Sequence, residues 1–302
     1  MPKVALITAI DSEDGNVLAD FLLSEGYAVH GIKLSAWGGD QQAELAVRQG
    51  VKLHTGDLRD VDSLMRVVQD IKPDEIYNLT GLVRASVPPI SALEAADVDA
   101  LGTLRLLQCI RVLGLEQKTR FFNASTSAMK ALLPQPVAMQ VSLTGPQDIA
   151  HVYAHLMTAH HREVYGMFAC NGVWFNPESP CTGERLVHQQ IDQGLANVAQ
   201  GHEDCILVDN LDSLRDWTEP RLAARMQWLA LQQLKANDSL LTNGAAKTVR
   251  QFIALTAKKQ GFELAFKGTG QNEYAVVVAA SKDRTPALNV GQVILGVLPS
   301  EP

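Results

Sequence analysis

Apolar runs alternate with amphipathic helical stretches along the first half of the sequence, and this alternation limits the choice of fold most strongly. Strands are expected at residues 3–8, 27–33, 51–58, 74–81, 119–127 and 168–176, and helices at 16–26, 38–50, 61–72, 98–115 and 149–165. Strand–helix alternation at this spacing predicts a parallel sheet with helices on both faces. The predicted fold class is therefore α/β, with a doubly wound parallel sheet.

The pattern changes in the second half, which predicts a division into two domains. Residues 128–144 carry little charge and contain prolines, so we expect a loop there. Further helices follow less regularly, near residues 185–200, 219–233 and 249–260. We predict a Rossmann-type domain over residues 1–170 and a smaller mixed α/β domain over residues 171–302, in a kind of fold whose segments often interleave.

Charge and composition exclude several classes of partner. The formal net charge of −7 provides no basic excess for general binding to nucleic acid or to a membrane surface. No apolar stretch approaches the length of a membrane span. The four cysteines are scattered without a CxxC pair, which is typical of reduced thiols in a cytoplasmic protein. We therefore expect a cytoplasmic protein that binds neither nucleic acid nor membrane.

The first turn, "ITAIDSEDG", lies where a dinucleotide-binding protein normally keeps its glycines. An apolar strand precedes it and a helix follows it, but Gly15 is the only glycine in the turn. A glycine-rich turn lets the backbone approach a pyrophosphate at the N-terminus of the helix. The local pattern therefore leaves open whether this turn is an altered cofactor loop or was never a cofactor loop.

Several longer segments together closely resemble the GDP-mannose 4,6-dehydratases, a family of extended short-chain dehydrogenases/reductases. They are "DVDALGTLRLLQCIRVLGLEQKTRFFNASTS", "REVYGMFACNGVWFNPESP", "NLDSLRDW" and "VRQFIALTAKKQG", and the similarity runs from Lys3 to about Pro299. The resemblance implies a Rossmann domain for NADP and a C-terminal domain for a GDP-sugar. It also implies a reaction that oxidises the sugar at C4, eliminates water across C5–C6 and returns the hydride to C6.

The residues that would hold NADP depart from the family pattern. The family's turn reads T-G-x-T-G-Q-D-G, and here Ala9 and Ser12 occupy the first two glycine positions while Gly15 is retained. Leu34 and Ser35 replace two arginines that reach the 2′-phosphate of the cofactor in the family. Hydrogen bonds to charged groups contribute about 1.5–3 kcal/mol each. We therefore predict that NADP binding is weak or absent.

Three positions that match cofactor contacts have structural explanations of equal standing. Asp57 and Leu58 match the pair that contacts adenine in the family, but a turn residue and a core residue would need no cofactor. Gly15 matches a cofactor contact, and a helix that starts close to a sheet also favours glycine. Both explanations stay open at this point.

The catalytic positions depart further. Thr126 is the only catalytic position of the family that is retained. Ala128 stands where the family has the glutamate that takes the C5 proton. Gln147 and His151 align with the family's tyrosine and lysine, and an amide cannot accept the proton of the C4 hydroxyl. Loss of one general base typically costs about 10²–10⁴-fold in rate. We therefore predict that ordinary dehydratase activity is absent.

The positions that face the sugar nucleotide are mixed. Those that match the family are Asn176, Glu178, Gly183, Glu184, Arg215, Asp216 and Trp217. Family cations are replaced by Cys181-Thr182 and by Gln189-Gln190, which weakens diphosphate binding. Arg215 could still hold one phosphate, or it could form a structural ion pair beside a buried indole.

Basic groups recur at the positions that would line the family's cleft. Arg84, Lys130 and His151 stand where the family has a histidine, a tyrosine and a lysine. We hypothesise an anion-binding pocket without hydride chemistry, which would take a small anionic ligand or a sugar nucleotide. His151 and His155 have the i,i+4 spacing of zinc ligands, but no third ligand is evident, so we predict no metal site.

The leading hypothesis is a degenerate member of the family that keeps the fold as a non-catalytic ligand-binding or partner subunit. The helices Val98–Leu113 and Asp148–Tyr165 occupy the positions of the family's interface, which predicts a homodimer or a heteromer. One alternative is an enzyme with new chemistry in which His151 acts as acid or base. Another is a residual GDP-sugar dehydratase with compensating residues.

Overall fold

The computed structural model describes two compact units. The described residues are 2–33, 48–81, 91–126, 145–174, 187–208, 210–242, 244, 246–285 and 287–297. The first unit comprises Met1–Phe175 and Thr218–Thr242, and the second comprises Asn176–Trp217 and Asn243–Pro302.

A seven-stranded parallel sheet forms the centre of the first unit. Its strands, in spatial order, are β3 (Lys52–His54), β2 (Ala28–Ile32), β1 (Val4–Thr8), β4 (Glu75–Asn78), β5 (Arg120–Ser125), β6 (Ala169–Trp174) and β9 (Ser239–Leu241). Every neighbouring pair is parallel. The order reverses between β1 and β4, and in such sheets ligands bind beyond the carboxyl ends of the strands at this point. The predicted α/β class with a doubly wound sheet is confirmed.

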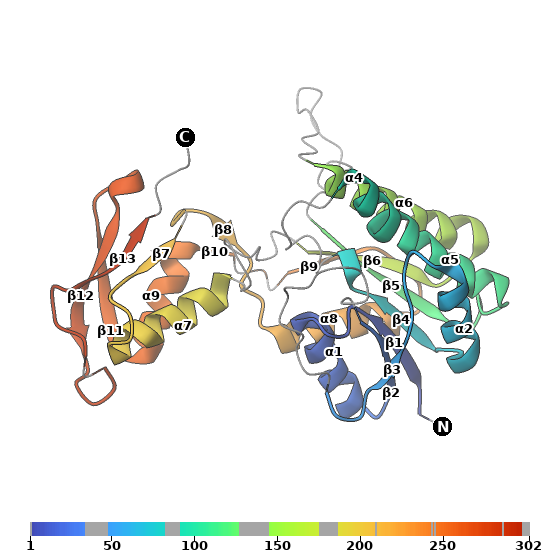
Figure 1. Ribbon diagram of the computed structural model, residues 1–302, viewed down its shortest axis with the longest axis horizontal. Coiled ribbons are helices and arrows are strands. Elements are labelled where there is room, and N and C mark those ends of the chain that lie inside the picture. The colour runs from blue at the N-terminus through green and yellow to red at the C-terminus, as the bar shows by residue number, and fades with distance from the viewer. Residues whose placement is uncertain are drawn as a thin grey trace. The chain divides into compact units, whose positions relative to one another are not determined.

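Helices cover both faces of this sheet (Figure 1). Helices α1 (Glu13–Ser24) and α8 (Pro220–Gln232) lie on one face, and α2 (Val61–Ile71), α5 (Gly102–Val112) and α6 (Pro146–Tyr165) lie on the other. Alternate residues of β1 separate the two cores, because Ile7 packs with Leu18 of α1, whereas Leu6 packs with Leu64 of α2. Two hydrophobic layers therefore fix the sheet from both sides.

The structure differs from the predicted elements in several places. The helix expected at 98–115 is divided into a π-helix, Ala95–Leu101, and α5, with the short α4 (Ala92–Glu94) before them. Helix α1 begins three residues earlier than expected, because Ser12 caps it. The strand expected at 51–58 ends at His54, where the chain leaves the sheet. The loop expected at 128–144 and most of the helix expected at 38–50 lie outside the described residues.

Three asparagines connect the central strands to one another. Asn78, Asn123 and Asn171 face each other in register on β4, β5 and β6, and all are buried. The side-chain amide of Asn78 donates to Asn123 at 3.1 Å, and that of Asn123 donates to Asn171 at 3.0 Å. Since each buried amide has a partner, this row contributes about 1 kcal/mol per bond and fixes the register of the strands beneath the predicted site.

The second unit contains a mixed four-stranded sheet. Its strands, in order, are β11 (Phe262–Lys267), β12 (Tyr274–Ala280), β13 (Val293–Val297) and β7 (Ile206–Val208). Helices α7 (Val187–Gln200) and α9 (Val249–Gln260) bury their apolar residues against it. A separate two-stranded ladder joins β8 (Leu214–Arg215) to β10 (Lys247–Thr248), and the short helix Gly270–Asn272 precedes β12. Among the described helices, none combines the length and apolar character that a membrane span requires.

Candidate functional site

The turn between β1 and α1 keeps an unusual backbone shape without the glycine that favours it. Ala9 has a φ of 53°, in the left-handed region, where a side chain with a Cβ costs roughly 1–2 kcal/mol. This residue stands at the first glycine position of the family turn. The following residue, Ile10, is fully buried, and its backbone N–H donates to the carbonyl of Ile32 at 3.2 Å. The strained residue Ala9 is therefore followed directly by a residue that is buried and hydrogen-bonded to the neighbouring strand.

Ser12 closes the N-terminus of α1 with its own hydroxyl. The Oγ atom accepts from the backbone N–H of Gly15 at 3.0 Å and donates to the carbonyl of Ala9 at 2.7 Å. The first N–H groups of a helix are the donors that hold a phosphate in dinucleotide-binding folds. The Ser12 hydroxyl therefore occupies a donor that a pyrophosphate would use.

Acidic side chains surround the same helix terminus. Asp11 is 8% exposed, and Glu13 and Asp14 form the first turn of α1. Carboxylates near a helix N-terminus interact favourably with the helix dipole. Asp14 has a counterpart in the family's turn, so Asp11 and Glu13 are the carboxylates that a cofactor pyrophosphate would meet in addition.

Gly15 has a packing role in this turn. A Cβ added at this residue would lie 2.3 Å from the carbonyl oxygen of Ala9 and 2.8 Å from the Cα of Ile10. Only glycine allows the helix to approach the turn this closely. The packing explanation of Gly15 therefore has direct geometric support, independent of any cofactor.

Asp57 and Leu58 are both engaged within the protein. Asp57 accepts from Nε and Nη2 of Arg59 at 3.0 and 2.7 Å. Burial opposes ionisation of Asp57, but the hydrogen bonds from Arg59 outweigh it and lower the pKa of the carboxyl. Leu58 is fully buried in the core, and its carbonyl accepts from Arg105 at 2.9 Å. These two residues thus have the turn and core environments that the sequence analysis weighed against adenine contact.

Thr126 and His151 meet beyond the carboxyl end of β5. The hydroxyl of Thr126 lies 3.2 Å from Nδ1 of His151, and both residues are buried. His151 comes from α6, and its ring lies against Gly81, where an added Cβ would be 3.4 Å from Nε2. The structure therefore brings together two of the residues predicted from the sequence, one retained family position and one replacement.

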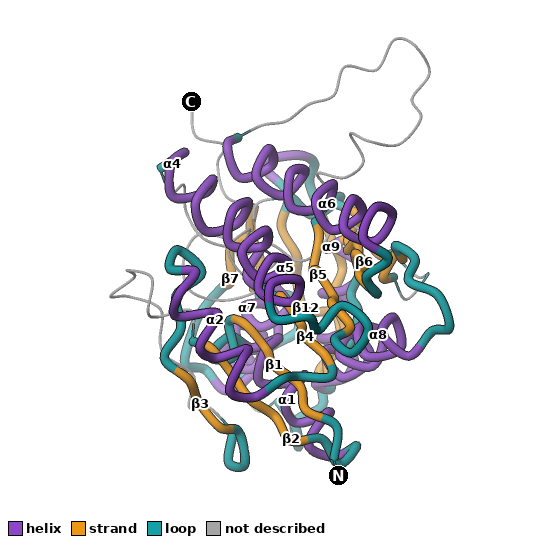
Figure 2. Tube along the Cα trace, turned by 90° about the vertical axis from the view of Figure 1, so that its right-hand side faces the viewer, coloured by secondary structure: helices purple, strands orange, loops and turns teal. Residues whose placement is uncertain are grey.

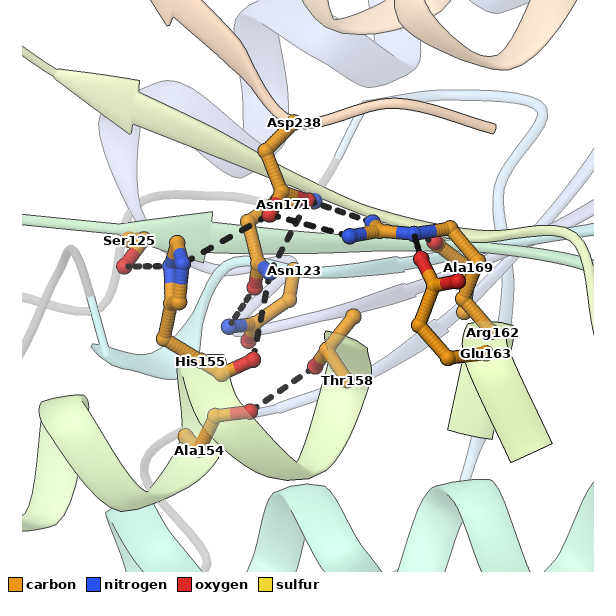
Figure 3. Close-up of polar contacts among 10 residues, drawn as sticks. All are labelled: Asn123, Ser125, Ala154, His155, Thr158, Arg162, Glu163, Ala169, Asn171 and Asp238. Carbon is orange, nitrogen blue, oxygen red and sulfur yellow. Dashed lines mark hydrogen bonds and ion pairs between the residues drawn. The ribbon is translucent and has the colours of Figure 1, made fainter. Parts of the chain in front are cut away.

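A second hydroxyl–imidazole contact lies one helical turn away, and the sequence analysis missed it. Ser125 faces His155 on α6, and Asp238, which precedes β9, lies on the other side of the same ring (Figure 3). The sequence analysis considered His155 only as a metal ligand. Within the described ranges, no three His, Cys, Asp or Glu side chains gather where they could hold a metal ion.

Arg215 lies in the second unit, on the two-stranded ladder. It is directly opposite Lys247 in the register of β8 and β10, and like charges in such positions repel each other. Its Nε atom is buried, and no acceptor lies within hydrogen-bond reach of it in the described part of the chain. Trp217 donates to the carbonyl of Lys247 at 3.0 Å and stacks on Phe252. An anion placed at Arg215 would satisfy the Nε–H.

Three of the predicted site residues lie outside the described residues. They are Arg84, Lys130 and Asn176. The hypothesis of a basic pocket that combines Arg84 and Lys130 with His151 therefore stays a prediction.

Comparison with known proteins decides the family. The sequence model of the family described as GDP-mannose 4,6 dehydratase matches residues 6–290. The chain belongs to this family. It is 44% identical to a GDP-mannose 4,6-dehydratase of Vibrio cholerae, over 99% of this chain and 83% of that protein. The identity to a GDP-mannose 4,6-dehydratase of Sinorhizobium fredii is 37%, over 93% of this chain and 83% of that protein.

Solved structures with the same fold act on other sugar nucleotides. A UDP-glucose 4-epimerase of Brucella ovis, in complex with NAD, superposes with a TM-score of 0.64 at 19% identity, over 86% of this chain and 83% of that chain. A dTDP-glucose 4,6-dehydratase of Bacillus anthracis, also in complex with NAD, gives a TM-score of 0.62 at 13% identity, over 85% of this chain and 80% of that chain. At these identities the likeness establishes the fold.

Replacement of Ser12 by alanine tests its role as the cap of α1. We expect Ser12→Ala to lower the free energy of unfolding by about 1 kcal/mol, the usual cost of losing an N-cap side chain. Ser24→Ala is the matched control, because Ser24 lies at the other end of α1 and is exposed. Urea denaturation measures both variants. Equal stability of Ser12→Ala and the wild type would contradict the assigned role.

Proposed function

We propose that this member of the GDP-mannose 4,6-dehydratase family does not carry out NADP-dependent dehydration and acts as a ligand-binding or partner subunit. The observation that carries the proposal is the closed N-terminus of α1, where the Ser12 hydroxyl bonds the N–H of Gly15. The resemblance adds support, because it places Gln147, His151 and Ala128 at the positions of the family's tyrosine, lysine and glutamate. On this proposal, the chain lacks both a strong binding site for a pyrophosphate and the side chains that accept protons in the family.

Incubation with GDP-mannose and NADP tests the proposal. We expect no 4-keto-6-deoxy sugar above the rate of a blank without protein, because two proton acceptors are replaced and each contributes about 10²–10⁴-fold. The product is measured by chromatography of the sugar nucleotides after hours of reaction. Turnover at an enzymatic rate would overturn the proposal and favour a residual dehydratase.

A second candidate function is acid–base chemistry by His151 without a cofactor. The contact of 3.2 Å between Nδ1 of His151 and the hydroxyl of Thr126 favours it, because it places an imidazole and a hydroxyl together at the carboxyl edge of the sheet. NADP-independent conversion of the sugar nucleotide in the same incubation, lost in His151→Ala, would distinguish this candidate.

Arg215 supports an anionic ligand. Its buried Nε–H has no acceptor among the described residues, and Lys247 adds a second positive charge across the ladder. A diphosphate offers several acceptor oxygens to such an arginine. The ligand class that fits this part of the second unit is therefore a nucleoside diphosphate or a sugar nucleotide.

Calorimetric titration with GDP tests the anion site. Arg215→Gln should weaken GDP binding by about 10–100-fold, which corresponds to the roughly 1.5–3 kcal/mol of a charged hydrogen bond. Arg221→Gln is the matched control, because Arg221 is exposed on α8 in the first unit. No binding of GDP to the wild type, or equal affinity of wild type and Arg215→Gln, would contradict the assignment.

An exposed apolar stripe on α6 supports a partner subunit. Ile149, Tyr153, Leu156 and Val164 are 58, 37, 50 and 60% exposed, and their spacing places them on one helix face. Helix α5 runs beside α6 (Figure 2), and it ends on Val112, which is 69% exposed. Apolar side chains gathered on neighbouring helices favour packing against another helical surface. A second copy or a paralogue with the same helix pair fits this surface.

A charge placed on the stripe tests the partner surface. We expect the wild type to sediment as a dimer and Leu156→Glu to sediment as a monomer, because the new carboxylate would be buried without a partner. Leu234→Glu is the matched control, since Leu234 is fully exposed and far from α6 in sequence. Sedimentation velocity measures the mass of each. Monomeric wild type, at concentrations where a family dimer forms, would contradict the homodimer.

A further inference from the structure

A serine hydroxyl, an imidazole and a carboxylate lie in a row, with His155 in the middle (Figure 3). The hydroxyl of Ser125 lies 3.3 Å from Nδ1 of His155, and Oδ2 of Asp238 lies 3.5 Å from Nε2 on the other side of the ring. Ser125 comes from the carboxyl end of β5, His155 from α6, and Asp238 from the residue before β9. Three separate segments thus converge on one imidazole.

Asp238 is held in place as a carboxylate. Its Oδ1 accepts from Nη1 of Arg162 at 2.6 Å and from the backbone N–H of Asn171 at 2.8 Å, and its Oδ2 accepts from Nη2 of Arg162 at 3.2 Å. Burial opposes its ionisation, but the hydrogen bonds from Arg162 and Asn171 outweigh burial and lower the pKa of Asp238. The residue is therefore ionised at neutral pH, with a fixed orientation.

The carboxylate sets the tautomer of His155. An ionised carboxylate only accepts hydrogen bonds, so it favours the proton on Nε2, which leaves the lone pair of Nδ1 directed at the Ser125 hydroxyl. Burial, together with the charge of Arg162, lowers the pKa of His155 below its ordinary value, although Asp238 acts in the opposite direction. The imidazole is then neutral at pH 7 and can accept a proton from Ser125.

We propose that Asp238, His155 and Ser125 form a nucleophilic triad that accepts the acyl group of a small activated ester. The arrangement of roles is that of serine hydrolases, with the two ring nitrogens exchanged. Ser125 Oγ attacks the carbonyl carbon, and its proton passes to Nδ1 of His155. The bond from the carbonyl carbon to the leaving oxygen breaks, and that oxygen departs with the electron pair. His155 then releases its proton to water, which leaves Ser125 acylated.

Burial defines the size of the acyl group. Ser125 is 2% exposed and the side chain of His155 is 13% exposed, which disfavours long acyl chains and makes the smallest acyl donors the ones to test. The reaction uses neither NADP nor a GDP-sugar. It therefore goes beyond the proposed function, and either proposal can fail without the other.

Reaction with p-nitrophenyl acetate tests the triad. We expect a burst of one nitrophenolate per chain and, by peptide mass spectrometry, an acetyl group on Ser125. Ser125→Ala should abolish this label, and His155→Gln should slow the burst by about 10²–10⁴-fold. The burst rate should stay near its plateau below pH 6.5, the ordinary pKa of histidine, because burial and the charge of Arg162 lower the pKa of His155 despite the opposing effect of Asp238.

Controls separate the triad from general surface reactivity and from misfolding. His160→Gln should keep the full burst, because His160 is exposed on the same helix and could only react nonspecifically. Ser125→Ala should stay folded by circular dichroism, since loss of one hydroxyl costs about 1 kcal/mol. A missing burst in the wild type, or acetylation that is found only at other residues, would overturn the proposal.

Discussion

The hydrogen-bonded turn between β1 and α1 is the feature of the first unit that bears most on cofactor binding. The Ser12 hydroxyl joins the carbonyl of Ala9 to the N–H of Gly15, so the turn and the start of α1 form a closed structure. A dinucleotide-binding protein leaves those donors for a phosphate. In this chain the Ser12 side chain accepts from one of them, the N–H of Gly15, and acidic residues add negative charge to the same helix end. The fold of the family is preserved, and we propose that the interaction that anchors the family's cofactor is replaced here.

Proton-transfer groups are nevertheless concentrated at the carboxyl edge of the same sheet. The row of asparagines fixes β4, β5 and β6 in register, and Asn171 extends it to Asp238 at 3.1 Å. Helix α6 then presents two imidazoles to two consecutive hydroxyls, His151 to Thr126 and His155 to Ser125. These contacts place proton donors and acceptors together at this edge. The proposed anionic ligand in the second unit and the proposed nucleophilic serine in the first need no hydride transfer.

The sequence predicted much of the fold because hydrophobic periodicity is a local property. Most described strands and helices of the first unit follow the pattern, apart from shifted ends and the divided helix at 98–115, and the predicted helix at 249–260 coincides with α9. Long-range pairings have no such signal: nothing local indicates that β9 joins the sheet beside β6, or that Asp238 reaches His155. The same limit applied to Ser12, where the sequence showed a missing glycine and the structure shows a hydroxyl that accepts from the N–H of Gly15. The residues that carry the resemblance thus located the site, but the partners of each side chain depend on tertiary structure.

The central claim is that the start of α1 no longer receives a dinucleotide. The most direct test is a crystal structure of the protein grown with saturating NADP. The account predicts electron density for Ser12 against the N–H of Gly15, with no pyrophosphate at the turn. A pyrophosphate seated on the N-terminus of α1, with the Ser12 side chain turned away from Gly15, would contradict it.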